Sequence, residues 1–153
     1  MHNISSRELK RGSSGNVLRS AGTIVTGMLA VIALSLGTDL GLRLIRLYPA
    51  EGEPMVEPAL NLLALWYRCV YNVIGAYIVL MLASDNGLRL LWIFTLLGFT
   101  LAAIGAVVTI PMNLGPSWYP ILLALSPFPC SWLGWKLHRW IRGGRRSTDF
   151  RNN

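Results

Sequence analysis

The chain has 153 residues, of which 53% are apolar and only 14% are charged, and its mean hydropathy is +0.47. This composition is unusually apolar for a soluble domain, and 46 residues between Arg89 and Lys136 include no Asp, Glu, Lys or Arg. Because one bilayer crossing takes about 20 apolar residues, this run predicts two membrane helices joined by a turn and argues against a soluble domain.

The N-terminal residues 1–19 form a basic leader that is rich in Ser, Gly and Arg and lacks apolar periodicity, so we predict a flexible tail. The first apolar segment, 20–42, has no charge from Ser20 through Thr38 and is long enough to cross a bilayer. The alternative, a cleaved signal peptide, has a shorter apolar region that ends in small residues. We therefore interpret 20–42 as an uncleaved first span.

Two further apolar segments, 59–83 and 90–110, are each long enough to cross a bilayer. The second span, 59–83, contains a single charged residue, Arg68. The third, 90–110, ends where the segment 111–116 (Pro-Met-Asn-Leu-Gly-Pro) concentrates residues that form turns. The sequence therefore predicts membrane helices in both segments.

The fourth span, 117–138, contains Pro127 and Pro129. A proline inside a helix leaves one backbone carbonyl without its usual donor and bends the axis. In lipid that carbonyl needs another donor, and Ser126 and Ser131 are the candidates. We interpret the prolines as a packing kink, and the broken helices that transporters use at binding sites are the alternative.

Basic residues are distributed unevenly between the two ends of the spans. The spans form one domain over 20–141, with basic tails at 1–19 and 142–153. One side of the membrane has eleven Lys and Arg residues, which lie in the two tails, in the loop after the second span and at the end of the fourth span. The opposite side has only Arg43 and Arg46, together with four acidic residues. Because Lys and Arg favour the cytoplasmic side, we predict an all-α, four-helix membrane bundle with both termini in the cytoplasm.

Arg68 is the most informative position in the sequence. A charge near the middle of a span costs about 2.5 kcal/mol or more, and such residues usually face other helices and have a partner. At helical spacing, the same side of the second span also carries Asn61, Asn72 and the adjacent Tyr71. We therefore predict a buried polar cluster that points into the bundle and includes Asp39 of the first span.

Asp39 is the only acidic residue inside a predicted span, and it lies in the same half of the membrane as Arg68. At 1.5 Å of rise per residue, the depths of the two differ by roughly 6 Å, which an Arg side chain can bridge. We predict an Asp39–Arg68 ion pair, for which Arg43 competes as a same-helix partner of Asp39. The pair either holds the helices in register or lets Arg68 line a site for an anionic solute or lipid headgroup.

Small residues recur at intervals of four in two spans. The first span carries Ala33, Gly37 and Gly41, and the third carries Gly98, Ala102 and Ala106. Such stripes let helix backbones approach closely in lipid. They predict either contacts within the chain or the face of a homo-oligomer.

The remaining residues predict no metal, cofactor or catalytic site. Cys69 and Cys130 fall inside spans and are interpreted as apolar fillers, and His2 and His138 have no ligand at suitable spacing. The Ser, His and acid that intramembrane hydrolysis needs are not present as a set. The net charge of +7 lies mostly beside the spans, which indicates contact with anionic lipid headgroups rather than with nucleic acid.

Four short stretches resemble a group of small, uncharacterised bacterial inner-membrane proteins with four spans. They are 63–68 (Leu-Ala-Leu-Trp-Tyr-Arg), 75–77 (Gly-Ala-Tyr), 114–120 (Leu-Gly-Pro-Ser-Trp-Tyr-Pro) and 129–134 (Pro-Cys-Ser-Trp-Leu-Gly). The resemblance implies a multi-pass protein of the inner membrane. It implies no activity, since the group has none that is established.

Two classes of function fit these observations. The first is a non-enzymatic accessory or scaffold protein that acts through contacts with lipids or with other membrane proteins. The second is a small transporter or channel protomer, which would need to form an oligomer, with Arg68 lining an anion or headgroup site.

Overall fold

The structure is a computed structural model that describes residues 5–49, 54–83, 86–113 and 115–149 of the chain. Every regular element in those ranges is an α-helix, which confirms the all-α prediction. The helices are α1 (Ser5–Leu44), α2 (Pro58–Leu82), α3 (Gly87–Thr109), α4 (Trp118–Leu125) and α5 (Pro127–Asp149). Three described segments are long and apolar enough to cross a membrane: Leu18–Leu44, Pro58–Leu82 and Gly87–Thr109.

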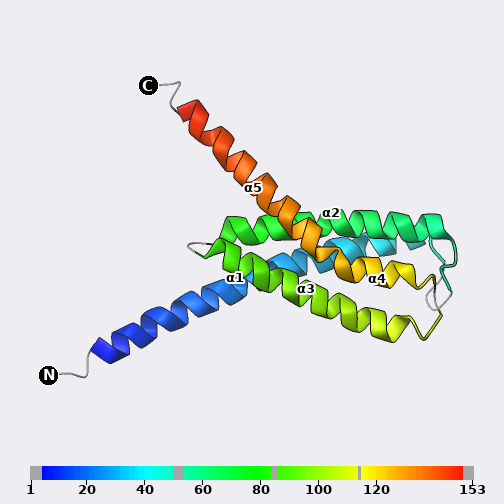
Figure 1. The fold of residues 1–153 in the computed structure, drawn as a ribbon, viewed down its shortest axis with the longest axis horizontal. Helices are drawn as coiled ribbons and strands as arrows, with labels where there is room; N and C mark the ends of the chain where they lie inside the picture. Colours follow the sequence, from blue (N-terminus) through cyan, green and yellow to red (C-terminus); the bar gives the residue numbers. More distant parts are fainter. Residues whose placement is uncertain (1–4, 50–53, 84–85, 114, 150–153) are drawn as a thin grey trace.

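The helices form a bundle from which two arms extend (Figure 1). α2, α3, α4 and the C-terminal half of α1 run side by side, while the start of α1 and the end of α5 diverge. Both arms leave from the end of the bundle where α2 ends and α3 begins. The other end holds the connections from α1 to α2 and from α3 to α4.

The two predicted tails differ from the structure. α1 begins at Ser5 rather than near residue 20, and α5 continues to Asp149. Once an apolar span has formed a helix, each further residue adds one hydrogen bond at little cost. No proline precedes Pro49 or follows Pro129 in the sequence, so the helices are not stopped at either end.

Prolines mark the boundaries of the two central helices. α2 begins at Pro58, at a first-turn position where the missing N–H has no partner to lose. α3 ends at Thr109, and Pro111 follows within two residues. Asn113 then takes a positive φ of 52°, a conformation that Asn tolerates, and it lies where the chain turns toward α4.

The predicted fourth span, 117–138, holds two helices that meet at Ser126, beside the prolines from which a kink is predicted. Pro127 has no N–H to donate to the carbonyl of Leu123, and the Ser126 hydroxyl donates to that carbonyl instead, at 2.8 Å. Ser131, the other candidate, is hydrogen bonded to the Thr95 hydroxyl of α3 at 2.7 Å. The carbonyl that Pro127 leaves open thus has a local donor, and Ser131 ties α5 to α3.

Two close helix crossings depend on glycine. Where α1 crosses α2, a Cβ on Gly27 would lie 2.6 Å from Val79 Cγ2 and 3.2 Å from the carbonyl oxygen of Gly75. Where α5 crosses α2, a Cβ on Gly134 would lie 3.0 Å from the carbonyl oxygen of Val73. These approaches leave no room for a larger residue, as is common where helices pack in lipid.

The predicted small-residue stripes contribute less to these crossings. A Cβ on Gly37 or Gly41 would have no described atom within 4 Å, so that stripe lies on an open face of α1. On α3, Gly98 faces Pro127 at 3.7 Å and Ala106 is buried. Sequence spacing therefore identified the α3 stripe but not the glycines at which α1 and α2 cross.

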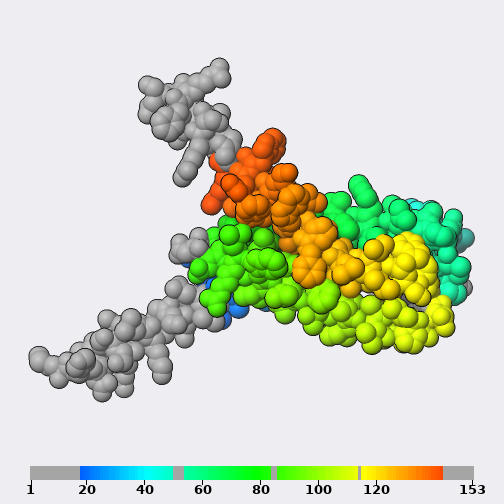
Figure 2. Space-filling view, viewed as in Figure 1, coloured from blue at the N-terminus to red at the C-terminus, as the bar shows by residue number. Residues whose placement is uncertain are grey.

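Large apolar side chains cover the outside of the bundle. Leu29, Trp66 and Val107, one on each of the first three helices, are 59%, 69% and 73% exposed. The space-filling view shows α4 and the start of α5 lying over α2 and α3 (Figure 2). An apolar surface this extensive would be unfavourable in water and suits a lipid environment.

Candidate functional site

The ion pair predicted from the sequence is present in the structure. Arg68 of α2 donates from Nη2 to Asp39 Oδ2 of α1 at 2.8 Å. The two side chains are 28% and 17% exposed, so both are largely shielded from solvent by neighbouring helices. The pair therefore connects two helices at a place where an unpaired charge would be costly.

Two tyrosines that sequence reasoning did not assign to the cluster complete it. Arg68 donates from Nη1 to the hydroxyl of Tyr119 on α4, at 2.8 Å. The hydroxyl of Tyr67 donates to Asp39 Oδ1. The guanidinium thus joins three helices, and each carboxylate oxygen of Asp39 accepts one hydrogen bond.

Signals for these tyrosines existed in the sequence. Tyr119 lies at the start of the fourth apolar segment, 117–138, and Tyr67 precedes Arg68 and so projects about 100° away from it around the helix. A phenol at the depth of a buried ion pair is a suitable partner, because its hydroxyl both donates and accepts. The depth of Tyr119 could have been predicted, but its direction depends on how α4 packs.

The other predicted members of the cluster make different contacts. Asn72 donates to the backbone carbonyl of Arg68 at 3.0 Å, within α2. The hydroxyl of Tyr71 is hydrogen bonded to the hydroxyl of Thr38 on α1 at 2.7 Å. Tyr71 therefore adds a second polar link between α1 and α2, whereas Asn72 stabilises the turn of α2 that holds Arg68.

Asn61 lies at the start of α2, away from the ion pair. Its amide nitrogen donates to the carbonyls of Met55 and Glu57, at 2.8 and 3.0 Å. It therefore fastens the end of the connection between α1 and α2 to the first turn of α2. From the same connection, Tyr48 donates to the Tyr67 hydroxyl at 3.5 Å.

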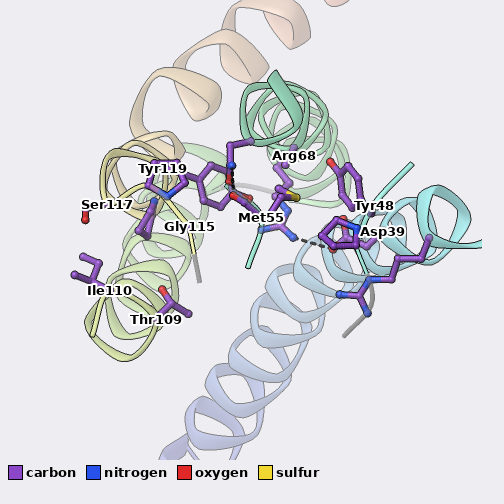
Figure 3. Close-up of a pocket in the computed structure, with 15 residues that line it drawn as sticks. Asp39, Tyr48, Met55, Arg68, Thr109, Ile110, Gly115, Ser117 and Tyr119 are labelled. Atoms are coloured by element: carbon purple, nitrogen blue, oxygen red, sulfur yellow. Dashed lines mark hydrogen bonds and ion pairs between the residues drawn. The ribbon is translucent and has the colours of Figure 1, made fainter. Parts of the chain in front are cut away.

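Arg68 projects into a polar cavity of about 330 Å³ at the end of the bundle that holds the α1–α2 and α3–α4 connections. Figure 3 shows Arg68 reaching from α2 across this cavity toward Asp39, with Tyr119 on the α4 side and Tyr48 on the α1 side. Further polar residues in its lining are Arg43, Asn61, Thr109 and Ser117. We refer to it as the polar cavity.

A second cavity, of about 310 Å³, lies between α1, α2, α3 and the α4–α5 kink. Asp39 and Arg68 line this cavity as well as the polar one. Most of its other lining is apolar and includes Val31, Phe94 and Leu101. We refer to it as the apolar cavity, and the ion pair forms the boundary between the two.

One polar atom of the cluster has no partner. Arg68 Nε is buried and makes no hydrogen bond within the part of the chain that the structure describes. An arginine has five N–H groups in a fixed planar arrangement, and the contacts with Tyr119 and Asp39 use two of them. The guanidinium therefore keeps donor capacity beyond its contacts inside the bundle.

The two thiols and the imidazole of His138 take no part in this site, and His2 lies outside the described residues. Cys130 is buried, Cys69 is half-buried, and neither forms a disulfide. The ring of His138 packs edge-on against Tyr77, with centroids 6.0 Å apart. No three His, Cys, Asp or Glu side chains gather anywhere among the described residues.

Basic residues on α5 lie over its tryptophans. Lys136 Nζ is 5.1 Å from the centroid of Trp132, and the Arg139 guanidinium carbon is 4.8 Å from that of Trp135. These cation–π contacts hold the basic heads beside the exposed ring of Trp132 and the half-buried ring of Trp135. Such pairs suit a membrane interface, where an aromatic body lies in lipid and a cation faces headgroups.

Comparisons of the chain with protein-family models, curated proteins and solved structures find no match. The resemblance to the bacterial four-span group therefore stays a prediction. The site is interpreted below from its own geometry.

Proposed function

We propose that the protein is a multi-pass protein of the bacterial inner membrane that acts without catalysis, as an accessory or scaffold protein, through contacts with lipids and other membrane proteins. It crosses the bilayer four times and keeps both termini in the cytoplasm. The fourth crossing is made by α4 together with the first turns of α5, which continue through the kink at Ser126.

The arrangement of the helix ends supports this topology. α1 and α5 diverge at the end of the bundle where α2 ends and α3 begins (Figure 1). Arg19, Arg89 and Lys136 lie on the helices that reach that end, and basic residues favour the cytoplasmic side. Alkaline phosphatase and fluorescent-protein fusions at residues 52, 85 and 153 test it: only the phosphatase fused at 52 should be active. Phosphatase activity at 85 or 153 would contradict the topology.

The observation that carries the scaffold function is that Arg68 of α2 joins its own helix to α1 and α4. Its contacts with Asp39 and Tyr119 occupy the charge that the sequence places near the middle of a span. A cation held in this way fixes the position and rotation of α1, α2 and α4 relative to each other. A rigid bundle with an apolar exterior is suited to presenting its surface to lipids and partner helices.

A second candidate, an oligomeric anion transporter or channel protomer, is favoured by the polar cavity beside Arg68. The two candidates differ in assembly and in flux. The full chain is purified in mild detergent for mass measurement and then reconstituted into liposomes loaded with chloride or inorganic phosphate. The scaffold function predicts no flux above that of protein-free liposomes. An oligomer with a flux that Arg68→Gln abolishes would support the transporter and refute the scaffold.

A further inference from the structure

α2 and α5 cross in parallel and in a fixed register. Both helices run away from the bundle end that holds the α1–α2 and α3–α4 connections (Figure 1). A Cβ on Gly134 of α5 would lie 3.0 Å from the carbonyl oxygen of Val73 on α2. One turn further along both helices, the rings of His138 and Tyr77 pack edge-on, with centroids 6.0 Å apart. The two contacts are offset by four residues on each helix, so the facing turns of α2 and α5 stay in step through the crossing.

The same register brings the two cysteines of the chain together. One turn before the contact between Val73 and Gly134, α2 carries Cys69 and α5 carries Cys130. The thiols of these two residues are hydrogen bonded to each other. A disulfide needs Cα atoms only about 4.4–6.8 Å apart, and the glycine at the crossing lets the two backbones approach closely. The fold therefore places two thiols from distant parts of the sequence where a bond between them can form.

The depth of the pair decides which oxidants can reach it. Val70 is the central residue of α2 (Pro58–Leu82), so Cys69 lies about 1.5 Å from the middle of that helix. With the helices across a bilayer, about 15 Å of hydrocarbon separates the thiols from water on either side. Neither cysteine lines the polar cavity. An oxidant that dissolves in lipid, such as a neutral quinone, is therefore favoured over an ionic one, such as oxidised glutathione.

We propose that Cys69 and Cys130 form a reversible dithiol–disulfide pair inside the bilayer, which a lipid-soluble quinone oxidises. In the oxidation two S–H bonds break and one S–S bond forms. The two electrons and two protons pass to the quinone, which becomes a hydroquinone. Cys69 is half-buried and meets the quinone, whereas Cys130 is 3% exposed and completes the bond from inside the bundle. This inference rests on the proposed placement of the helices across a bilayer, and it gives the scaffold two redox states.

The disulfide would fix the base of the arm that α5 forms. α5 diverges from the bundle beyond its crossing with α2 (Figure 1). The chain between the two cysteines includes all of α3 and α4. A bond that closes so long a loop restricts the unfolded chain and so stabilises the folded one. We therefore expect the oxidised protein to unfold at a higher Tm than the reduced protein.

Thiol counting on the full chain tests this proposal. The reduced protein is reconstituted into phosphatidylcholine liposomes and mixed with decylubiquinone, then denatured and labelled with N-ethylmaleimide, and intact masses count the labels. The reduced chain takes up two labels. The oxidised chain should take up none, be lighter by two hydrogen atoms and yield one hydroquinone. Because access limits thiol oxidation, decylubiquinone should act at least about tenfold faster than oxidised glutathione at the same concentration. Two labels after exposure to decylubiquinone, or equal rates with the two oxidants, would overturn the proposal.

A matched variant separates the pairing from the mere presence of two thiols. Cys69→Ser combined with Val70→Cys keeps two thiols at nearly the same depth but turns one of them by about 100° around α2. This register variant should keep both labels, and Cys69→Ser alone should keep one. A disulfide within one chain of the register variant, formed at the wild-type rate, would overturn the pairing of α2 with α5.

Reversal of the bond completes the test. In detergent, dithiothreitol should restore both labels and the lower Tm of the wild type, and failure to restore the labels would overturn the reversible pair. Disulfides that link two chains rather than two helices would overturn it as well. The fusion experiment decides the proposed topology separately, so a correctly inserted chain whose thiols stay reduced refutes the redox pair alone.

Discussion

Neutralising Arg68 is the most direct test of how the bundle is held together. In Arg68→Gln the ion pair with Asp39 and the charged hydrogen bond to Tyr119 are both lost. The carboxylate of Asp39 then loses its charged hydrogen bond from Arg68 and keeps the hydrogen bond from the Tyr67 hydroxyl. The Asp39 side chain is 17% exposed in the wild-type packing, so water compensates for the lost partner only in part.

The expected loss follows from the geometry of the pair. Removing one partner of a fully buried ion pair costs about 3–5 kcal/mol. Because Arg68 and Asp39 are 28% and 17% exposed, we reduce this to about 2–3 kcal/mol. For a chain of this size, 1 kcal/mol corresponds to about 2–4 °C in Tm. Arg68→Gln should therefore lower Tm by about 5–10 °C.

The assay is thermal unfolding of the full chain in mild detergent, followed by the fluorescence of its six tryptophans. Arg89→Gln, which changes an exposed arginine at the start of α3, is the matched control and should unfold with the wild type. Asp39→Asn and the double variant complete a cycle, in which the double loss should be about 1–2 kcal/mol smaller than the sum of the single losses. A Tm for Arg68→Gln within 1 °C of wild type, or strict additivity in the cycle, would refute a structural role for the pair.

Three further changes test the packing. Gly134→Leu should lower the free energy of unfolding by about 1–3 kcal/mol or prevent folding, because its Cβ would lie 3.0 Å from a backbone oxygen of α2. The control Gly37→Leu, on the open face of α1, should unfold like wild type. Equal Tm values for the two variants would contradict the α2–α5 crossing. Ser131→Ala should lower the free energy of unfolding by about 0.5–1.5 kcal/mol through loss of the Thr95 contact, and no loss in a denaturant titration would exclude that link. Ser126→Ala should cost about 1–3 kcal/mol by leaving a carbonyl in the kink without a donor. Adding Pro127→Ala restores the backbone N–H that can reach this carbonyl, so the double variant should regain stability, and a further loss in the same titration would argue against this explanation of the kink.

Local features of this protein were readable from its sequence because they depend on neighbouring residues alone. Apolar runs of sufficient length predicted the helices, since a chain in lipid must satisfy its backbone hydrogen bonds internally. Pro127 predicted the kink because the missing N–H is a property of that residue. Arg68 predicted a partner, and Asp39 was identified because rise per residue converts sequence position into depth.

Tertiary structure decided which helix faces meet. The periodicity of a helix places residues around its own axis but does not fix the rotation of its neighbours, so Tyr119 could be assigned a depth but not a contact with Arg68. The close crossing uses Gly27 and Gly75 rather than the regular stripe that includes Gly37, because α1 turns that stripe away from α2. The two cavities on either side of the ion pair likewise arise only when α1, α2, α3 and the kinked α4–α5 segment are packed together.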